Sequence, residues 1–224
     1  MVKTHRDTIS VNDCQVLAHY QFEADQYIIT LESKEIADST RPGQFVHLSV
    51  SGMLAMRRPI SVMSVDADNG TFDLLYKIVG EGTKQLADRK IGDVLSVIGP
   101  IGNGFELTDR KIPLLIGGGV GMPPMIAIAQ KIKDNAYYNP YVILGSEVPF
   151  PFEASQSSLN GFNSSKFYTM PLLEEWRVPC GLASLQDYEG VYKGYVTDLA
   201  REYLDSLSSS DLKEVEVFTC GPNP

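Results

Sequence analysis

The sequence of 224 residues predicts two consecutive domains, an antiparallel β-barrel over residues 1–105 and an α/β domain with a parallel sheet over residues 106–224. Up to about Pro100, short runs rich in β-branched and aromatic residues follow one another almost without helix, as in a small barrel. Beyond Phe105, strand-like apolar runs alternate with helical ones, which is typical of a parallel sheet with crossover helices. Three consecutive glycines, Gly117–Gly119, mark the first strand-to-helix turn of the second domain.

Turn residues separate the strands of the predicted barrel. Asp68-Asn69-Gly70 is typical of a tight hairpin, so the strands on either side of it are expected to pair. One short helix is expected at Gly82–Ala87, with Thr83 as a candidate cap. The six predicted strands are Val11–Tyr20, Gln26–Glu32, Phe45–Val50, Ile60–Val65, Phe72–Val79 and Val94–Ile98.

The second domain begins after a polar connection, Glu106–Lys111. Its first strand is a continuous apolar run, as expected of a strand that a parallel sheet buries on both faces. Pro149–Phe162 reads as a loop where a crossover helix would be expected. The expected strands are Ile112–Ile116, Tyr141–Gly145, Lys166–Met170 and Val215–Thr219, and the expected helices are Pro123–Lys133 and Thr197–Leu207.

The glycine-rich turn predicts a site for an anion. Gly117–Gly119 and Gly121 let a backbone without side chains approach a ligand closely, and Pro123 fits the first turn of a helix. A helix start offers N–H groups and the positive end of a dipole, which favour a negative charge. Met122 stands where the G-x-G-x-x-G fingerprint has its last glycine, so a tight turn that binds nothing is the alternative.

Three loops are expected to meet at one edge of the parallel sheet. Gly117–Gly121, Gly145–Glu147 and Cys220–Pro222 each follow a predicted strand. Because parallel strands end at the same edge, and open α/β sheets bind ligands there, the three loops predict one binding site.

A second anion site is predicted in the barrel. Strand alternation puts Arg58 and Ile60 on one face of their strand and Ser61 on the other. Lys77 and the helix start at Gly82-Thr83 follow a short distance on, and a guanidinium, a hydroxyl and a helix N-terminus are what a diphosphate needs. The neighbouring Arg57 can equally be solvated. Two anion sites, one in each domain, indicate two nucleotides.

Composition excludes several classes of protein. A formal net charge of −9, without a cluster of Lys and Arg, argues against a nucleic-acid partner. Cys14, Cys180 and Cys220 are too few for a disulfide framework or a four-thiolate metal site within this chain. No apolar run approaches the ~20 residues of a membrane span, and the first residues lack a signal-peptide core, so a cytoplasmic location is expected.

Six short motifs follow one another along the chain: Pro42-Gly43-Gln44-Phe45, Arg58-Pro59-Ile60-Ser61, Gly80-x-Gly82-Thr83, Gly99-Pro100-x-Gly102-x-Gly104-Phe105, Gly117-Gly118-Gly119-Val120-Gly121-x-Pro123-Pro124 and Cys220-Gly221-Pro222. In this order they resemble the ferredoxin-reductase superfamily, and the resemblance runs from about residue 7 to residue 222. The Arg-Pro-Ile-Ser form and the Gly-Asn-Gly-Phe end of the barrel are most similar to the electron-transfer subunits of type B dihydroorotate dehydrogenase.

The resemblance implies that the barrel binds FAD and that the sheet domain binds NAD(H). The implied FAD-binding residues are Arg58, Pro59, Ile60, Ser61, Leu75, Tyr76, Lys77, Gly82 and Thr83. The implied NAD-binding residues are Gly117, Gly118, Gly119, Val120, Gly121, Cys220, Gly221 and Pro222. The alternatives are that Tyr76 packs in the core and that Cys220 is simply a small residue at the end of a buried strand.

The function implied is that of an NAD(H)-linked FAD oxidoreductase subunit, which exchanges electrons with a dihydroorotate dehydrogenase catalytic subunit in pyrimidine biosynthesis. Hydride passes directly between the two cofactors, so no catalytic residue is expected, and His5, His19 and His47 are expected to be structural or exposed. A stand-alone NAD(P)H flavin or ferredoxin reductase, or a subunit of another redox complex, is one alternative. A nucleotide-binding regulatory module that passes no electrons is another.

Two departures from the family stand out. Members normally continue past Cys-Gly-Pro into a tail whose four cysteines hold a [2Fe–2S] cluster, whereas this sequence stops at Pro224, so we expect a longer native chain rather than a protein without the cluster. Ser184–Gly190 differs from the usual loop before Gly-x-Val-Thr, which puts the ribose contacts in question. Glu147 either accepts a ribose hydroxyl, which would favour NAD over NADP, or is a solvated carboxylate.

Overall fold

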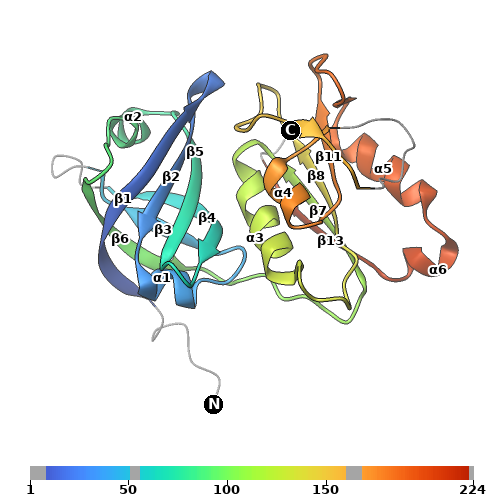
Figure 1. The fold of residues 1–224 in the computed structure, drawn as a ribbon, viewed down its shortest axis with the longest axis horizontal. Helices are drawn as coiled ribbons and strands as arrows, with labels where there is room; N and C mark the ends of the chain where they lie inside the picture. The colour runs from blue at the N-terminus through green and yellow to red at the C-terminus, as the bar shows by residue number, and fades with distance from the viewer. Residues whose placement is uncertain (1–8, 51–55, 160–167, 222–224) are drawn as a thin grey trace. The chain divides into compact units, whose positions relative to one another are not determined.

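The computed structural model describes residues 9–50, 56–159 and 168–221. The chain divides into two compact units, Met1–Phe105 and Glu106–Pro224. Figure 1 colours the first unit from blue to green and the second from green to red. Among the described residues, no helix is long and apolar enough to cross a membrane.

The first unit is a closed six-stranded barrel, as predicted, with the order β1-β2-β5-β4-β3-β6 and antiparallel neighbours throughout (Figure 1). Alternate residues of each strand point into it, and Val16, Ile29, Leu74 and Val97 lie in one buried cluster. The strands are β1 (Ser10–Phe22), β2 (Gln26–Glu32), β3 (Phe45–Leu48), β4 (Arg58–Asp66), β5 (Thr71–Lys77) and β6 (Val94–Ile101), with a 3₁₀ turn, η2 (Glu23–Asp25), after β1.

The predicted hairpin between β4 and β5 is confirmed. Asp66 pairs with Thr71 across the turn, and the Asp66 carboxylate accepts a hydrogen bond from the backbone N–H of Asn69 at 2.9 Å. Gly70 has φ 68°, the left-handed conformation that glycine adopts without strain. The Asp-Asn-Gly sequence therefore closes the hairpin in the way its residue types predict.

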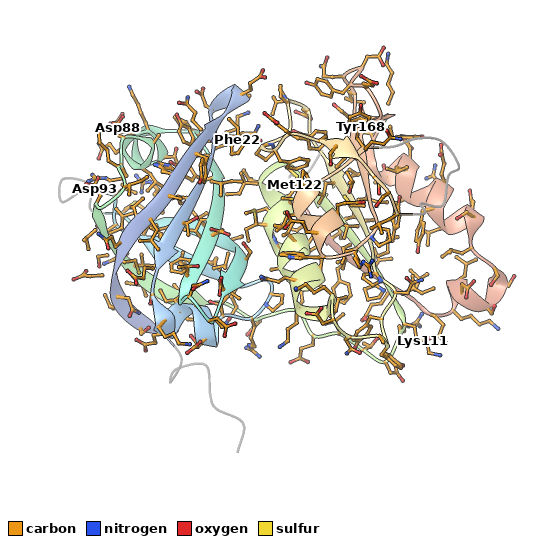
Figure 2. The ribbon with its side chains drawn as sticks, viewed as in Figure 1. Phe22, Asp88, Asp93, Lys111, Met122 and Tyr168 are labelled. Carbon is orange, nitrogen blue, oxygen red and sulfur yellow. The ribbon has the colours of Figure 1, made fainter. Side chains whose placement is uncertain are left out.

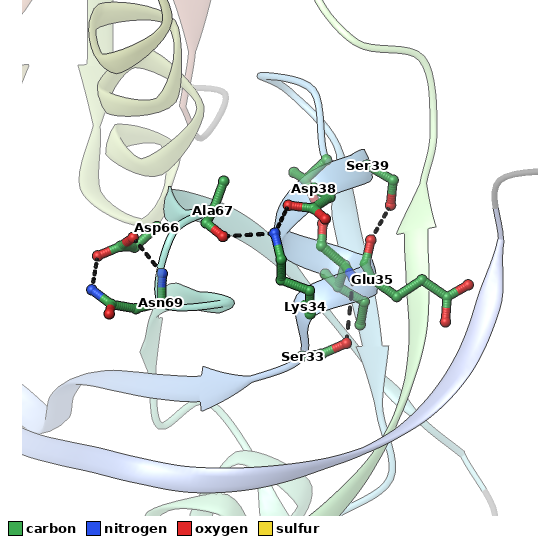
Figure 3. A network of polar contacts seen from close by, with 10 residues as sticks. Ser33, Lys34, Glu35, Asp38, Ser39, Asp66, Ala67 and Asn69 are labelled. Atoms are coloured by element: carbon green, nitrogen blue, oxygen red, sulfur yellow. Dashed lines mark hydrogen bonds and ion pairs between the residues drawn. The ribbon is translucent and has the colours of Figure 1, made fainter.

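A short helix, α1 (Lys34–Ser39), was not predicted. Figure 3 shows how it is held: the Ser33 hydroxyl accepts a hydrogen bond from Ile36 N at 3.3 Å, which caps the helix start. Lys34 Nζ donates to Asp38 at 2.6 Å and to the Ala67 carbonyl at 2.9 Å, so α1 is also tied to the hairpin turn. Six residues are too few to show a helical period in the sequence.

The second unit contains a five-stranded parallel sheet of order β12-β11-β8-β7-β13, which confirms the predicted α/β fold. α5 packs Leu199 and Tyr203 on the face that carries Leu114 and Ile143. Alternation turns Leu115 to the other face, and α3 packs against the same strands. The sheet strands are β7 (Ile112–Gly118), β8 (Tyr141–Gly145), β11 (Cys180–Ser184), β12 (Tyr192–Lys193) and β13 (Val215–Cys220). The helices are α3 (Met122–Ile132), α4 (Pro171–Glu175), α5 (Val196–Ser206) and α6 (Ser209–Leu212), with a 3₁₀ turn, η3 (Gly119–Gly121), before α3.

The prediction of a sheet strand at Lys166–Met170 is wrong. Only β10 (Tyr168–Thr169) forms in its described part, and β10 pairs antiparallel with β9 (Ser155–Gln156) in a separate two-stranded sheet. The strand that lies beside β8 is β11, which the sequence did not reveal. Its residues, Cys-Gly-Leu-Ala-Ser, are mostly small and weak strand formers, although all five are buried. Residues 149–159 contain no helix, in keeping with the predicted loop.

Candidate functional site

Arg58 and Gly82 meet on the barrel. Arg58 begins β4, and Gly82 lies in the first turn of α2 (Glu81–Ala87). A Cβ atom on Gly82 would lie 1.8 Å from Arg58 Nε and 2.3 Å from its Cζ, so the guanidinium group covers a backbone that has no side chain. Arg58 also donates to the Met56 carbonyl at 2.7 Å. Two residues predicted to hold a diphosphate are therefore brought together, 24 positions apart in sequence.

Thr83 shapes the turn before α2. Its hydroxyl accepts hydrogen bonds from the backbone N–H groups of Val79 at 2.9 Å and Gly80 at 3.3 Å, and donates to the Gly80 carbonyl at 3.0 Å. Gly80 is the N-cap residue, so Thr83 stabilises the helix start from its third helical position. Since the hydroxyl is used in the fold, the group that Thr83 can offer an anion is its backbone N–H.

The other β4 residues divide as strand alternation predicts. Ile60 is buried in the barrel core, whereas Pro59 is exposed and Ser61 is half-buried. Arg57 is tied into the barrel, because it donates to the Ser96 carbonyl at 2.7 Å and to the Ser96 hydroxyl at 3.0 Å. The alternative of a solvated Arg57 is therefore wrong, and the two adjacent arginines have different partners.

The Tyr76 ring lies in the barrel core. It stacks on Tyr27 at a centroid distance of 5.3 Å, and its hydroxyl is 2.8 Å from His19 Nε2. His19 Nδ1 lies 2.9 Å from the Arg89 carbonyl, which can only accept, so Nδ1 is the donor in that hydrogen bond. Burial raises the pKa of Tyr76, which keeps the hydroxyl protonated. His19 is thus a structural residue.

Leu75 and Lys77 lie on the opposite face of β5 from Tyr76. Leu75 is buried without joining the barrel-core cluster, and Lys77 is half-buried. Side chains on this outer face can line a ligand, whereas a contribution from Tyr76 is limited to its backbone. The structure thus agrees with the core-packing alternative for the Tyr76 ring.

The glycine turn of the second unit is built by close backbone approach. Gly119 has φ 54°, and Val120, next to it, is 54% exposed. A Cβ atom on Gly121 would lie 2.4 Å from the Cys220 carbonyl oxygen and 2.7 Å from Gly221 Cα. The turn after β7 and the end of β13, which were predicted to converge, therefore touch each other at Gly121.

The start of α3 offers few hydrogen-bond donors. Met122, labelled in Figure 2, begins the helix, and its N–H donates to the Gly119 carbonyl. Pro123 and Pro124 follow, and proline has no N–H group. An anion bound at this helix start would therefore depend on the peptide N–H groups of the preceding glycine turn, Gly119–Gly121.

Cys220 ends β13 beside this turn, and Gly117 is its partner in the β7 register. It is a free, half-buried thiol, and burial raises its pKa, so the neutral thiol is the form at neutral pH. A Cβ atom on Gly221 would lie 3.5 Å from Gly118 N, an ordinary van der Waals distance, so Gly221 lies beside the backbone of Gly118. Pro222, the last predicted NAD-binding residue, lies outside the described residues.

Two buried serines that the sequence did not single out fix the neighbouring loops. The Ser184 hydroxyl, at the end of β11, donates to the Ser146 carbonyl at 2.8 Å. Ser146 N donates to the Ala183 carbonyl at 3.1 Å, and the Ser146 hydroxyl accepts from Val148 N at 3.3 Å. The backbone on both sides of Glu147 is therefore held at the carboxyl edge of the sheet, while Glu147 itself is exposed.

The loop Ser184–Gly190, which differs from the usual loop of the family, packs in part against β10. Gly190 has φ 70°, and a Cβ atom there would lie 1.8 Å from Tyr168 Cδ2, so the ring covers the glycine. Figure 2 labels Tyr168, whose N–H donates to the Gly190 carbonyl at 2.9 Å. The exposed Asp187 lies 3.3 Å from Lys193. The contacts of Gly190 with Tyr168 and of Asp187 with Lys193 thus hold the loop in place. Asp187 and Glu189 give it an acidic character.

Known proteins match both units. Residues 13–105 match the family model of the oxidoreductase FAD-binding domain, which confirms the predicted FAD-binding oxidoreductase domain in the barrel. The electron transfer subunit of dihydroorotate dehydrogenase B (NAD(+)) from Listeria innocua is 33% identical over 218 residues, covering 94% of this chain and 74% of the relative. Its counterpart from Shouchella clausii is 31% identical over 209 residues, covering 89% and 70%.

The chain belongs to the family of dihydroorotate dehydrogenase B electron transfer subunits. The family resemblance that the six motifs predicted is thereby confirmed. The alignment with the Listeria innocua electron transfer subunit covers 94% of this chain. The motif residues of the barrel and of the glycine turn therefore lie within the aligned length.

Solved structures share the two-unit fold of this family member. The NADH-dependent reduced ferredoxin–NADP oxidoreductase superimposes with a TM-score of 0.68 at 24% identity, covering 90% of this chain and 64% of that chain. The ferredoxin reductase in carbazole 1,9a-dioxygenase gives a TM-score of 0.71 at 19% identity, covering 96% and 62%. This chain therefore spans less than two thirds of those proteins, and at such identities the likeness concerns the fold.

Proposed function

We propose that this chain is an NAD(H)-linked FAD oxidoreductase subunit that moves electrons between NAD(H) and a dihydroorotate dehydrogenase catalytic subunit, in pyrimidine biosynthesis. The observation that carries the proposal is the similarity of 33% over 94% of the chain to an electron transfer subunit of that enzyme. The two candidate nucleotide sites, one in each unit, support it. Bound FAD and NADH supply the hydride-transfer chemistry, and the protein binds and orients them.

The barrel fits the diphosphate of FAD. The Arg58 guanidinium lies over the backbone of Gly82, where a Cβ atom would collide with it. The start of α2 therefore carries a positive charge and has no side chain at Gly82. In the proposal, Arg58 and the backbone N–H groups of Gly82 and Thr83 hold the diphosphate. The residues proposed to line the flavin are Pro59, Ile60 and Ser61 of β4, and Leu75, Tyr76 (through its backbone) and Lys77 of β5.

The sheet unit fits a second dinucleotide. Gly117–Gly121, including the exposed Val120, present a side-chain-poor backbone for a diphosphate, and Gly121 fits against the end of β13 only because it has no Cβ. Cys220, Gly221 and Pro222 are proposed to lie next to the nicotinamide. The neutral thiol at Cys220 adds no negative charge there and needs no proton transfer.

Glu147 is proposed to accept the ribose 2′-hydroxyl of NAD(H). The loops after β8 and β11 carry Glu147, Glu153, Asp187 and Glu189 and no Lys or Arg within 146–154 and 185–191, an environment that repels a 2′-phosphate. Replacing Glu147 with glutamine is expected to lower kcat/KM for NADH about 10-fold, because the hydrogen bond from the ribose hydroxyl would then go to a neutral oxygen instead of a charged one. Steady-state kinetics with NADH and NADPH measure this change.

Glu153→Gln is the matched control for Glu147→Gln, since it removes the same charge from an exposed position in the same loop. It is expected to leave the preference for NADH over NADPH unchanged. Equal effects of the two substitutions would mean that Glu147 acts only through general charge, as the solvated alternative holds.

A [2Fe–2S] cluster on the route to the partner would need ligands other than the cysteines described here. Cys14 and Cys180 are fully buried in different units, and within residues 9–50, 56–159 and 168–221 no group of His, Cys, Asp and Glu is suited to a metal.

The purified protein tests the proposed function. We expect a yellow protein whose flavin absorbance bleaches rapidly on mixing with NADH, and co-purification with a dihydroorotate dehydrogenase catalytic subunit when both are produced together. A colourless protein that cannot take up FAD would contradict the proposal and favour a regulatory module. Rapid bleaching without association would favour a stand-alone reductase.

A further inference from the structure

The last residue of the barrel unit is fixed to its own unit. Phe105 N donates to the Pro42 carbonyl at 2.8 Å. Its ring lies over Gly43, where a Cβ atom would come within 2.6 Å of Phe105 Cδ2, and Gly43 has the left-handed φ of 90°. Phe105 is therefore held by a backbone hydrogen bond and by a ring contact that only glycine permits.

The chain is fixed again three residues later, this time to the sheet unit. Glu216 of β13 accepts two hydrogen bonds from Thr108, from its backbone N at 3.1 Å and from its hydroxyl at 2.9 Å. Arg110 donates to the carbonyls of Lys213 at 2.8 Å and Val215 at 3.0 Å. Both contacts bind the incoming chain to the edge strand β13 and the turn before it.

Two tyrosines after α3 complete this attachment. The Tyr138 hydroxyl donates to the Thr108 carbonyl at 3.1 Å, and the Tyr137 hydroxyl donates to the Asp109 carbonyl. From Thr108 onward, successive residues of the connection are thus bonded to β13 or to the segment after α3.

Only Glu106 and Leu107 remain between the two anchored segments, and neither makes a hydrogen bond or an ion pair among the residues that the structure describes. We propose that Glu106–Leu107 is the hinge between the FAD-binding and NAD-binding units, and that Glu216 and Arg110 are positioning residues that keep it two residues long. This inference rests on the proposed function, in which a nicotinamide held by one unit must reach a flavin held by the other.

A hinge of this length has a kinetic consequence. Phe105 and Thr108 are three residues apart along the chain, so the anchored ends of the two units can separate by at most about 11 Å. Hydride transfer needs the reacting atoms about 3–3.5 Å apart and aligned, and a short tether raises the effective concentration of that arrangement. Lengthening or loosening the hinge should therefore slow the transfer step without changing how either unit binds its nucleotide.

The test inserts two glycines between Glu106 and Leu107 of the full chain and measures flavin reduction by saturating NADH in a stopped-flow instrument. Because effective concentration falls with about the −3/2 power of tether length, doubling the flexible length is expected to slow reduction about threefold. FAD content and the Kd for NADH are expected to stay unchanged. An unchanged reduction rate would overturn the inference.

Substitutions at β13 test the anchor without changing the chain length. Glu216→Ala is expected to slow reduction in the same way, whereas Glu216→Gln keeps an oxygen that accepts both Thr108 hydrogen bonds and is expected to restore the rate. Glu214→Ala, a half-buried position beside the anchor, is the control and should match the parent protein. Equal rates for Glu216→Ala and Glu216→Gln would overturn the role of Glu216.

The proposed function and the hinge inference predict different failures in these experiments. If NADH does not reduce the flavin of the parent protein, the proposed function is wrong. If the parent is reduced rapidly and the insertion and Glu216→Ala are reduced equally fast, the function stands and the hinge inference is wrong.

Discussion

Replacing Gly82 with alanine is expected to weaken FAD binding about 10- to 100-fold. The new methyl group would lie 1.8 Å from Arg58 Nε, so the guanidinium must leave the position it occupies over α2. The charge-assisted hydrogen bonds that Arg58 is proposed to make with the diphosphate would then be lost, and each is worth about 1.5–3 kcal/mol. Titration of the flavin-free protein with FAD, followed by fluorescence, measures the change.

Gly80→Ala is the matched control for Gly82→Ala. Gly80 lies two residues earlier, has an extended backbone, and a Cβ atom there meets nothing within 4 Å. It is expected to bind FAD like the parent protein. Arg58→Ala should reproduce the loss seen with Gly82→Ala, and normal FAD affinity in either variant would contradict the placement of the diphosphate.

Replacing Gly121 with alanine is expected to lower kcat/KM for NADH about 100-fold while leaving FAD bound. The added Cβ atom would lie within 2.7 Å of Cys220 and Gly221 backbone atoms, so the turn and the end of β13 must move apart. A displacement of about 1 Å at a site that orients a reactant costs about 100-fold in rate. Steady-state kinetics with NADH and a chemical electron acceptor measure the effect, and the flavin spectrum reports the barrel unit.

A control separates this effect from a general loss of stability. Overpacking at Gly121 costs about 1–3 kcal/mol of folding free energy. Ile128→Val removes a buried methylene from the middle of α3 and costs about 1 kcal/mol, with no change at the turn. If Ile128→Val and Gly121→Ala reduce activity equally, the close approach at Gly121 has no specific role in binding NADH.

Local patterns in the sequence were sufficient for most of the fold. The structure places β2 at Gln26–Glu32 and β8 at Tyr141–Gly145, the residues that the sequence predicted, because their side chains carry a strong strand signal by themselves. β11 carries no such signal, since Cys180–Ser184 becomes a strand only by pairing between β8 and β12. The six-residue α1 was missed because it is shorter than two helical turns and depends on Ser33 and on a lysine contact with a distant turn.

The candidate sites were predictable in composition and less so in geometry. The motifs contain the residue types that are proposed to bind two nucleotides, and Arg58 and Gly82 do lie together. Which way a side chain points was not predictable: the Tyr76 ring enters the core, and the Thr83 hydroxyl is used by the turn before α2. Pro123 does lie in the first helical turn, as predicted, and together with Pro124 it leaves the N–H donors at this position to the glycine turn.

By itself, the sequence determined the two-unit architecture, the family, and the residue types of both candidate sites, since these depend on periodicity and on short motifs that are local in the chain. Only the tertiary structure decided the contacts between distant segments. Gly121 meets Cys220 across 99 positions, and Thr108 meets Glu216 across 108, because parallel pairing places β7 beside β13. Such contacts cannot be inferred from local sequence, which is why the need for glycine at position 121 and the attachment of Thr108 to β13 are seen only in the tertiary structure.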